Sequence, residues 1–154
     1  MQGDAEVIEL LNEVLTNELT AVNQYFLHAR MQKNWGFLKL GEYTYAESID
    51  EMKHADLLIE RILFLEGHPN VQRLDPVRIG ETVPEQLEAD MAVEVHAIDA
   101  LQRGIAVCQD KDDVVTRLLF ESILSSEQEH IGYLETQLSL LQSLGEAQYL
   151  AAHL

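Results

Sequence analysis

The sequence contains a single cysteine, Cys108, among its 154 residues. One thiol cannot form a disulfide within the chain and cannot supply the thiolates of a zinc or iron–sulfur cluster. Glycine and proline are also scarce, with 8 and 3 residues, and no apolar run is long enough to cross a membrane. The first residues, MQGDAEVIELLNEVL, lack the basic segment and small-residue cleavage site of an export signal. We therefore expect a cytoplasmic protein without a membrane partner.

Basic residues are few as well. The chain has 10 Lys plus Arg against 27 Asp plus Glu, which gives a formal net charge of −17. Such a surface repels nucleic acid, because nucleic-acid binding depends on neutralising phosphates. It attracts cations, although the same charge is equally consistent with simple solubility. The charge therefore argues against a nucleic-acid partner and permits a metal function without requiring one.

Apolar residues recur with helical spacing in four long segments, and 47% of the chain is hydrophobic, enough for a substantial core. The pattern predicts an all-α fold with a short fifth helix at the C-terminus. The expected helices run from about Asp4 to Lys33, from Phe37 to Leu65, from Pro84 to Gln109, from a cap at Asp112 or Asp113 to Gly145, and from Glu146 to Leu154.

Three of the connections are short, and the one from Asn70 to Val83 is long. It contains Pro76 and Gly80, which favour a connection over a helix. A short link makes neighbouring helices antiparallel, whereas about 14 residues at roughly 3.3 Å each can run the length of a bundle. We expect one domain over residues 1–154, an up-down-down-up four-helix bundle with one long crossover.

Carboxylates interrupt the apolar stripes of the first and third segments. Apolar residues spaced alternately by four and three positions flank Glu94, and a similar line flanks Glu18. Such a stripe faces the interior of a bundle. A buried carboxylate without a partner is costly, so both residues call for a counter-charge. The stripes consist of Leu11, Leu15, Glu18, Val22, Tyr25 and Ala29, and of Leu87, Met91, Glu94, Ile98, Leu101, Ile105 and Cys108.

The second and fourth segments each carry Glu-x-x-His within their stripe. Glu51 pairs with His54 and Glu127 with His130, which puts each pair on one helix face, a single turn apart. One copy is unremarkable in a chain rich in glutamate, but two copies, each at mid-helix in an apolar stripe, form a specific pattern. The stripes consist of Glu47, Glu51, His54, Leu58, Ile62 and Leu65, and of Phe120, Ile123, Glu127, His130, Leu134, Leu138 and Leu141.

The glutamates at positions 18, 51, 94 and 127 lie near the midpoints of their segments and hence at one level of the bundle. Four like charges packed together need counter-charge, which two metal ions would supply. Carboxylates with two imidazoles suit iron or manganese better than zinc. The alternative is that some of these acids lie on solvated faces. The complete pattern predicts a two-metal site.

The chain resembles the bacterioferritins along essentially its whole length. The stretches NELTAVNQYFLHARM, ESIDEMKHAD, IERILFLEG and EQEHIGYLETQL carry the resemblance. Two lone glutamates plus two Glu-x-x-His pairs is also the ligand set of ferritin-like di-iron bundles. The resemblance implies a ferritin-like, iron-storing subunit that oxidises Fe(II) and assembles, through two-fold dimers, into a hollow 24-subunit shell with haem b between subunit pairs.

The resemblance also implies a role for individual residues of the di-iron centre. Glu18 and Glu94 would be terminal ligands, one for each iron, and Glu51 and Glu127 would bridge the two irons. His54 and His130 would each add one nitrogen. Tyr25 resembles a tyrosine that bonds to a ligand carboxylate or donates an electron, although an ordinary core tyrosine is the alternative.

Met52 lies one residue past Glu51, about 100° around the helix, so it points away from the metal-facing stripe. A lone methionine on a helix flank usually serves packing. The resemblance of ESIDEMKHAD instead implies that Met52 binds haem iron across a two-fold axis, with Tyr45 beside it. Haem would then assist the release of iron, with a small ferredoxin as the electron donor.

The sequence departs from many bacterioferritins in places that concern the route of iron. Ala46 stands where many members have a histidine, which acts there with Asp50 as an iron site on the inner wall. Gly132 and Ser139 replace pore residues that are acidic in some relatives, while Asn34 and Glu66 are kept. We expect the four remaining histidines to serve surface or packing roles: His28, His68, His96 and His153.

The sequence pattern is also compatible with other functions. A di-iron oxidase acting on an organic substrate would need a pocket, for which 154 residues leave little room. A peroxide-reducing rubrerythrin would need more cysteines. A haem-bearing structural subunit could co-assemble with a second, active bacterioferritin subunit, but the complete ligand set argues against that role. A plain helical adaptor has only the charge in its favour. The sequence therefore predicts a ferroxidase.

Overall fold

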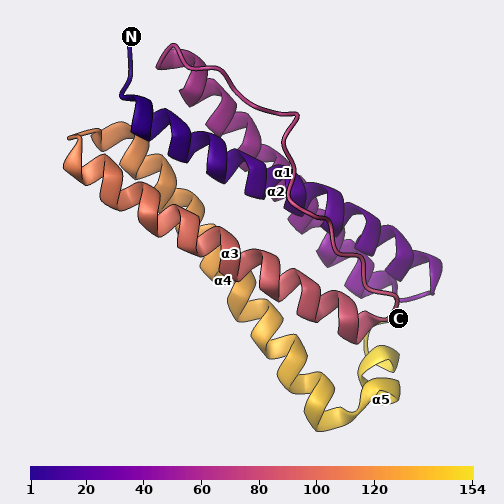
Figure 1. The fold of residues 1–154 in the computed structure, drawn as a ribbon. Coiled ribbons are helices and arrows are strands. Elements are labelled where there is room, and N and C mark those ends of the chain that lie inside the picture. Colours follow the sequence, from indigo (N-terminus) through magenta and orange to yellow (C-terminus); the bar gives the residue numbers. More distant parts are fainter.

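The computed structural model describes the whole chain, residues 1–154, and contains helices but no strand (Figure 1). The boundaries of the four long helices lie within one residue of those expected from the sequence. No helix is long and apolar enough to span a membrane. The helices are α1 (Ala5–Asn34), α2 (Leu38–Phe64), α3 (Val83–Asp110), α4 (Val114–Leu144) and α5 (Glu146–Ala151).

Side-chain caps explain where three of the long helices begin. The Asp4 carboxylate accepts hydrogen bonds from the first-turn amides of α1, and Asp113 accepts one from an amide of α4. Thr82 caps α3, so this helix starts at Val83, one residue before the expected opening at Pro84. The proline still lies in the first turn, where its missing N–H costs nothing.

The order of the helices is the expected up-down-down-up arrangement. In Figure 1, α1 and α4 run in one direction, and α2 and α3 run in the other. The crossover between α2 and α3 therefore has to travel the length of the bundle, and it does so alongside α1. The fifth helix packs against the end of α4, where the Tyr149 hydroxyl donates to Gln137 Oε1 over 2.7 Å.

A polar ladder on α1 holds the crossover in place. Its members lie four residues apart, on one face of the helix, and each accepts a hydrogen bond from the crossover. The Thr20 hydroxyl accepts from the Asp75 amide at 3.0 Å, and Gln24 Oε1 accepts from the Arg78 amide at 3.1 Å. The ladder consists of Asn12, Thr16, Thr20, Gln24 and His28.

The core is divided into two apolar clusters with a charged layer between them. The larger cluster includes Leu11, Leu58 and Phe120, and the smaller includes Leu40 and Leu134. On α2, α3 and α4 the glutamates that interrupt the stripes lie in sequence between members of the two clusters, and on α1 Glu18 follows the buried members of the larger cluster. Apolar packing on both sides thus keeps water from the charged layer.

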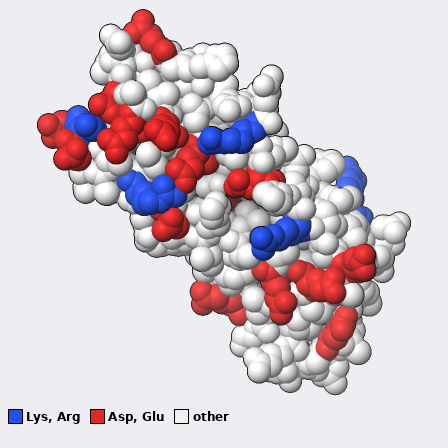
Figure 2. Space-filling view, in the orientation of Figure 1, with Lys and Arg blue, Asp and Glu red and all other residues white.

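Among the charged side chains on the face seen in Figure 2, acidic ones predominate over basic ones. Asp and Glu side chains gather toward both ends of the bundle, with Lys and Arg side chains scattered among them. This distribution fits the net charge of −17. A surface of this kind concentrates cations near the protein.

Candidate metal centre

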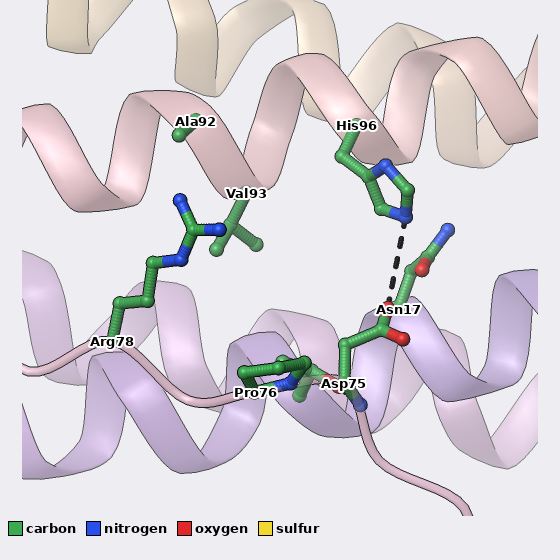
Figure 3. Close-up of a pocket in the computed structure, with 8 residues that line it drawn as sticks. Asn17, Asp75, Pro76, Arg78, Ala92, Val93 and His96 are labelled. Atoms are coloured by element: carbon green, nitrogen blue, oxygen red, sulfur yellow. Dashed lines mark hydrogen bonds and ion pairs between the residues drawn. The ribbon is translucent and has the colours of Figure 1, made fainter.

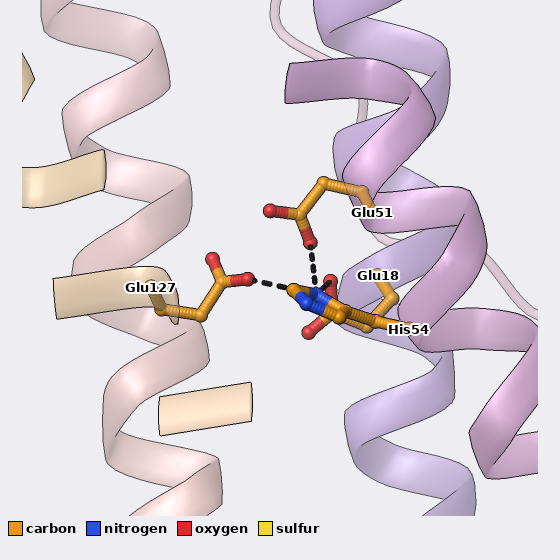
Figure 4. A group of neighbouring side chains, drawn as sticks. All are labelled: Glu18, Glu51, His54 and Glu127. Carbon is orange, nitrogen blue, oxygen red and sulfur yellow. Dashed lines mark ion pairs between the residues drawn. The ribbon is translucent and has the colours of Figure 1, made fainter. Parts of the chain in front are cut away.

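The predicted ligands meet in the middle of the bundle. Their ligand atoms form two groups, and within each group the atoms lie within 4.8 Å of one another. Both groups contain Glu51 and Glu127. The first group adds Glu18 and His54 (Figure 4), and the second adds Glu94 and His130. We call these residues the carboxylate–histidine cluster: Glu18, Glu51, His54, Glu94, Glu127 and His130.

The two groups share two carboxylates, and this is the geometry that two neighbouring cations require. Glu51 comes from α2 and Glu127 from α4, so each shared carboxylate reaches the cluster from a different helix. In Figure 4 the Glu51, Glu127 and Glu18 side chains converge on the His54 ring. Nδ1 of His54 lies 3.2 Å from Glu127 Oε1 and 3.5 Å from Glu51 Oε2.

The cluster is buried but short of hydrogen-bond partners. Eight buried side-chain N or O atoms in the molecule lack a hydrogen bond, and six of the eight belong to this cluster. They include both oxygens of Glu127, one oxygen of Glu18 and Nδ1 of His54. Since buried polar groups are almost always satisfied, such a concentration of unpaired oxygen and nitrogen atoms at one place makes this cluster the candidate metal site.

Burial also shifts the acid–base equilibria of the cluster. It raises the pKa of Glu18 and Glu127, and raises that of Glu94 well above the ordinary carboxyl value. Burial alone would lower the pKa of His54, but the neighbouring Glu127 and Glu18 carboxylates raise it to about 10. Without metal the cluster therefore retains protons, which bound cations would displace.

Tyr25 lies against the cluster. Its hydroxyl donates a hydrogen bond to Glu94 Oε1, and its ring meets the His130 ring edge-on with the centroids 5.2 Å apart. His130 Nδ1 is 3.0 Å from the same Glu94 oxygen. Burial and the nearby carboxylates raise the pKa of Tyr25 well above its usual range. The hydroxyl thus stays protonated and orients Glu94.

The ligand types fit iron. Hard carboxylate oxygens suit divalent and trivalent iron or manganese, and imidazole suits iron as well. No thiolate is near, since Cys108 is buried in the larger apolar cluster. The composition of the cluster thus agrees with the metal expected from the sequence.

Comparison with known proteins reveals the same relationship over nearly the whole chain. A family model described as "Ferritin-like domain" matches residues 8–144. The bacterioferritin of Mycolicibacterium paratuberculosis is 56% identical over 151 residues, which cover 98% of this chain and 95% of that protein. The chain belongs to the bacterioferritin family. The bacterioferritin of Streptomyces coelicolor is 58% identical over 98% of this chain and 90% of its own length. The bacterioferritin of Rhodobacter capsulatus is 50% identical over 94% of this chain and 90% of its own length.

Glu47 lies next to the cluster, and the sequence predicted no role for it as a ligand. Its Oε2 is 3.4 Å from His130 Nδ1, and burial raises the pKa of Glu47 to about 7. Tyr43 contacts this carboxylate and stacks on Tyr133 with the ring centroids 3.5 Å apart. The sequence did indicate that Glu47 faces the bundle interior, because it opens the stripe of the second segment four residues before Glu51.

Met52 lies outside the cluster, on an open face of α2. Its side chain is 48% exposed, and Ile49 beside it is 38% exposed. Tyr45 lies two turns before Met52 on the same face, and its ring packs against Phe26 with the centroids 5.8 Å apart. A thioether flanked by apolar side chains and left uncovered within one chain fits a haem shared with a second copy.

The remaining histidines lie away from the cluster, as expected. His28 is buried, with Nδ1 2.9 Å from Asp90 Oδ1 and Nε2 accepting from the Gly80 amide. His96 is exposed beside Asp75, and His68 lies on the surface near the start of the crossover. His153 contacts Gln137 at the end of the bundle. Their contacts indicate packing and surface roles.

The residues for which the resemblance implies a departure from many bacterioferritins lie on open surface. Ala46, Gly132 and Ser139 are exposed, and Asp50 is partly exposed. A methyl group has no ligand atom, so Ala46 leaves Asp50 without the partner that a histidine would provide on this helix face.

Proposed function

We propose that each chain binds two Fe(II) ions in the carboxylate–histidine cluster, oxidises them to Fe(III), and stores the product as ferric mineral inside a 24-subunit shell of identical chains. The observation that supports this best is the shared pair of carboxylates in a cluster that holds six of the eight unpaired buried polar atoms. Family membership supports iron as the metal, since the relatives are bacterioferritins.

The cluster residues bind and stabilise the iron substrate. Glu51 and Glu127 would bridge the two ions. Glu18 and His54 would complete the ligand set of one ion, and Glu94 and His130 that of the other. The carboxylates favour Fe(III) over Fe(II), because the higher charge gains more from each anionic ligand. Each Fe(II) gives up one electron, and dioxygen or hydrogen peroxide accepts both electrons together with protons.

The product must then leave the cluster for the interior of the shell. His130 or a bridging carboxylate would swing aside as the gate. Glu47 supports this route, because its carboxylate lies 3.4 Å from His130 Nδ1 and offers iron a further oxygen ligand just outside the cluster. With Ala46 in place of a histidine, we propose that transfer through this gate replaces oxidation at an inner-wall site.

Met52 would hold haem b at the interface of a two-fold dimer. One chain supplies one thioether, so the Met52 side chains of two copies would hold the haem together. Haem, when bound, supplies a one-electron carrier for reducing stored Fe(III), with a small ferredoxin as the external donor. The residues around Met52 would position the group by apolar contact and exclude water from its edge.

Absorption spectroscopy during aerobic Fe(II) addition tests the proposal. The purified protein should oxidise about two Fe(II) per chain in a fast phase, well ahead of protein-free buffer. Further iron should form a ferric absorption that co-migrates with the assembled shell in size-exclusion chromatography. Oxidation at the rate of protein-free buffer, or iron that separates from the protein, would refute it.

A further inference from the structure

A pocket of about 390 Å³ opens where the crossover passes over α1 and α3, and no residue of the carboxylate–histidine cluster lines it (Figure 3). The crossover contributes Asp75 and Arg78, α1 contributes Asn17, and α3 contributes Val93 and His96. The pocket has no part in the proposed oxidation. Two of its polar side chains, Asn17 and Arg78, nevertheless lack the hydrogen-bond or acidic partner that an acidic protein would readily supply.

Asn17 is the first of these groups. Its side chain lines the pocket, the residue is only 3% exposed, and its Nδ2 has no hydrogen-bond partner. Outside the carboxylate–histidine cluster, the only other such atom in the molecule is Gln32 Oε1. A buried amide that lacks an acceptor costs about 1–3 kcal/mol, so it indicates a missing acceptor at this position.

Arg78 is the second group. In a chain with 27 acidic residues, its guanidinium forms neither an ion pair nor a side-chain hydrogen bond. Only the backbone amide of Arg78 is engaged, by Gln24. In Figure 3 the guanidinium extends from the crossover toward Val93 and Ala92, across the pocket.

The one carboxylate of the pocket already has a partner. Asp75 Oδ2 lies 3.6 Å from His96 Nε2 (Figure 3), and the Asp75 amide is held by Thr20. The pair leaves Arg78 as the cation without an acidic partner. The pocket is thus lined by a buried N–H of Asn17 that has no acceptor and by Arg78, an exposed residue whose permanent charge has no acidic partner.

We propose that this pocket binds an oxyanion of the phosphate class. The Arg78 guanidinium would contact two of its oxygens, and Asn17 Nδ2 would donate to a third. The volume exceeds that of inorganic phosphate, and Pro76 and Val93 add apolar walls, so a phosphorylated organic molecule also fits. The pocket adjoins the iron site in sequence, since Asn17 and Val93 directly precede Glu18 and Glu94.

Calorimetric titration of inorganic phosphate into the assembled full-length protein tests the proposal. Iron is first removed by reduction and chelation, because ferric ions themselves bind phosphate, so the result does not depend on ferroxidase activity. We expect one saturable site per chain and at least about tenfold weaker binding in Arg78→Gln, which loses a charge-assisted contact. Asn17→Leu should weaken binding as well. Arg117→Gln removes the same charge from α4 and should bind like the wild type.

A second titration with adenosine diphosphate distinguishes the two sources of the anion. Tighter binding than inorganic phosphate, lost in Arg78→Gln, would indicate a phosphorylated organic ligand, whereas equal or weaker binding would indicate the free ion. No saturable phosphate or nucleotide binding up to about 10 mM would overturn the proposal, as would unchanged binding in Arg78→Gln. Equal weakening in Arg117→Gln would also overturn it, because general charge would then explain the effect.

Discussion

At the scale of single residues, burial determines how the cluster behaves. Glu94 is fully buried and Glu127 nearly so, and ionised carboxylates are costly in such surroundings. Protons offset this cost when metal is absent, as the raised pKa values of both residues indicate. Cations would offset it better, since they neutralise several carboxylates at once. The iron-free protein thus gives up stability for its ability to bind metal.

This account predicts how the stability of the iron-free protein depends on pH. Above the ordinary value of 4.5, Glu94 is ionised in the unfolded chain but still protonated in the folded one. Folding therefore takes up a proton, and the unfolding temperature should fall as the pH rises from about 5 to 8. The raised pKa of His54, about 10, acts in the same direction above its ordinary value of 6.5. Glu94→Gln, which stays neutral, should show a smaller fall by calorimetry. A steeper fall than in the wild type would contradict the account.

Met52→Leu tests the haem assignment separately from the iron site. The substitution nearly conserves volume, so it should cost less than about 1.5 kcal/mol of stability. Leucine has no ligand atom, so the Soret band of the purified protein should disappear. Fe(II) oxidation should persist while reductive release slows. Normal haem content in the variant would show that another residue is the ligand.

The sequence predicts which residues form the cluster but not how their side chains are arranged. Glu18 and Glu94 stand out because a charge in an apolar stripe is rare. The contact between Glu47 and His130 and the unpaired Nδ2 of Asn17 depend on side-chain rotamers, which periodicity does not specify. Glu47 in particular shared the predicted stripe, yet the pattern gave no reason to place it beside His130.

At the scale of secondary-structure elements, the path of the crossover depends on α1. Four of the five ladder residues satisfy backbone amides that would otherwise lack partners, and Thr16 accepts from the Arg73 side chain. Together they fix a segment that has no regular structure of its own. The helices were predictable because their apolar stripes and caps are local signals. The ladder was not, because polar residues every four positions also describe an ordinary solvated helix face.

Thr20→Val tests the ladder with an isosteric change. The hydroxyl that accepts from the Asp75 amide is lost, and leaving that amide unpaired costs about 1–3 kcal/mol. Hydrogen exchange at the Asp75 amide and its neighbours should quicken by at least about tenfold. Thr136→Val is the matched control, since the Thr136 hydroxyl donates only to Gly132 O in its own helix. Equal exchange in both variants would rule out the ladder.

Ala46→His tests whether α2 lacks an inner-wall iron site. Crystals of the wild type soaked in Fe(II) should show no ordered iron beside Asp50, because a single carboxylate is too weak a ligand set. The histidine in the variant should create such a site and change the slow phase of mineral growth. Ordered iron beside Asp50 in the unmodified protein would contradict the proposal. So would a di-iron site that stays fully occupied as the mineral grows.

At the scale of the whole molecule, charge and apolar packing have separate effects. The net charge of −17 favours the approach of Fe(II) from any direction, so it cannot by itself identify a site. The two apolar clusters, by contrast, leave one layer of the bundle for charged groups. The layer could be predicted from sequence, because its four glutamates fall at matching heights on helices of similar length.

Stopped-flow Fe(II) oxidation in Glu127→Ala tests the central claim most directly. The carboxylate of Glu127 belongs to both groups of the cluster, so its loss should remove the binding of both ions. The initial oxidation rate should fall by at least about a hundredfold, while the shell stays assembled in size-exclusion chromatography. Glu135→Ala, the same change at an exposed position of α4, should retain the wild-type rate. Wild-type oxidation in Glu127→Ala, with the shell intact, would contradict the assignment of the cluster as the ferroxidase centre.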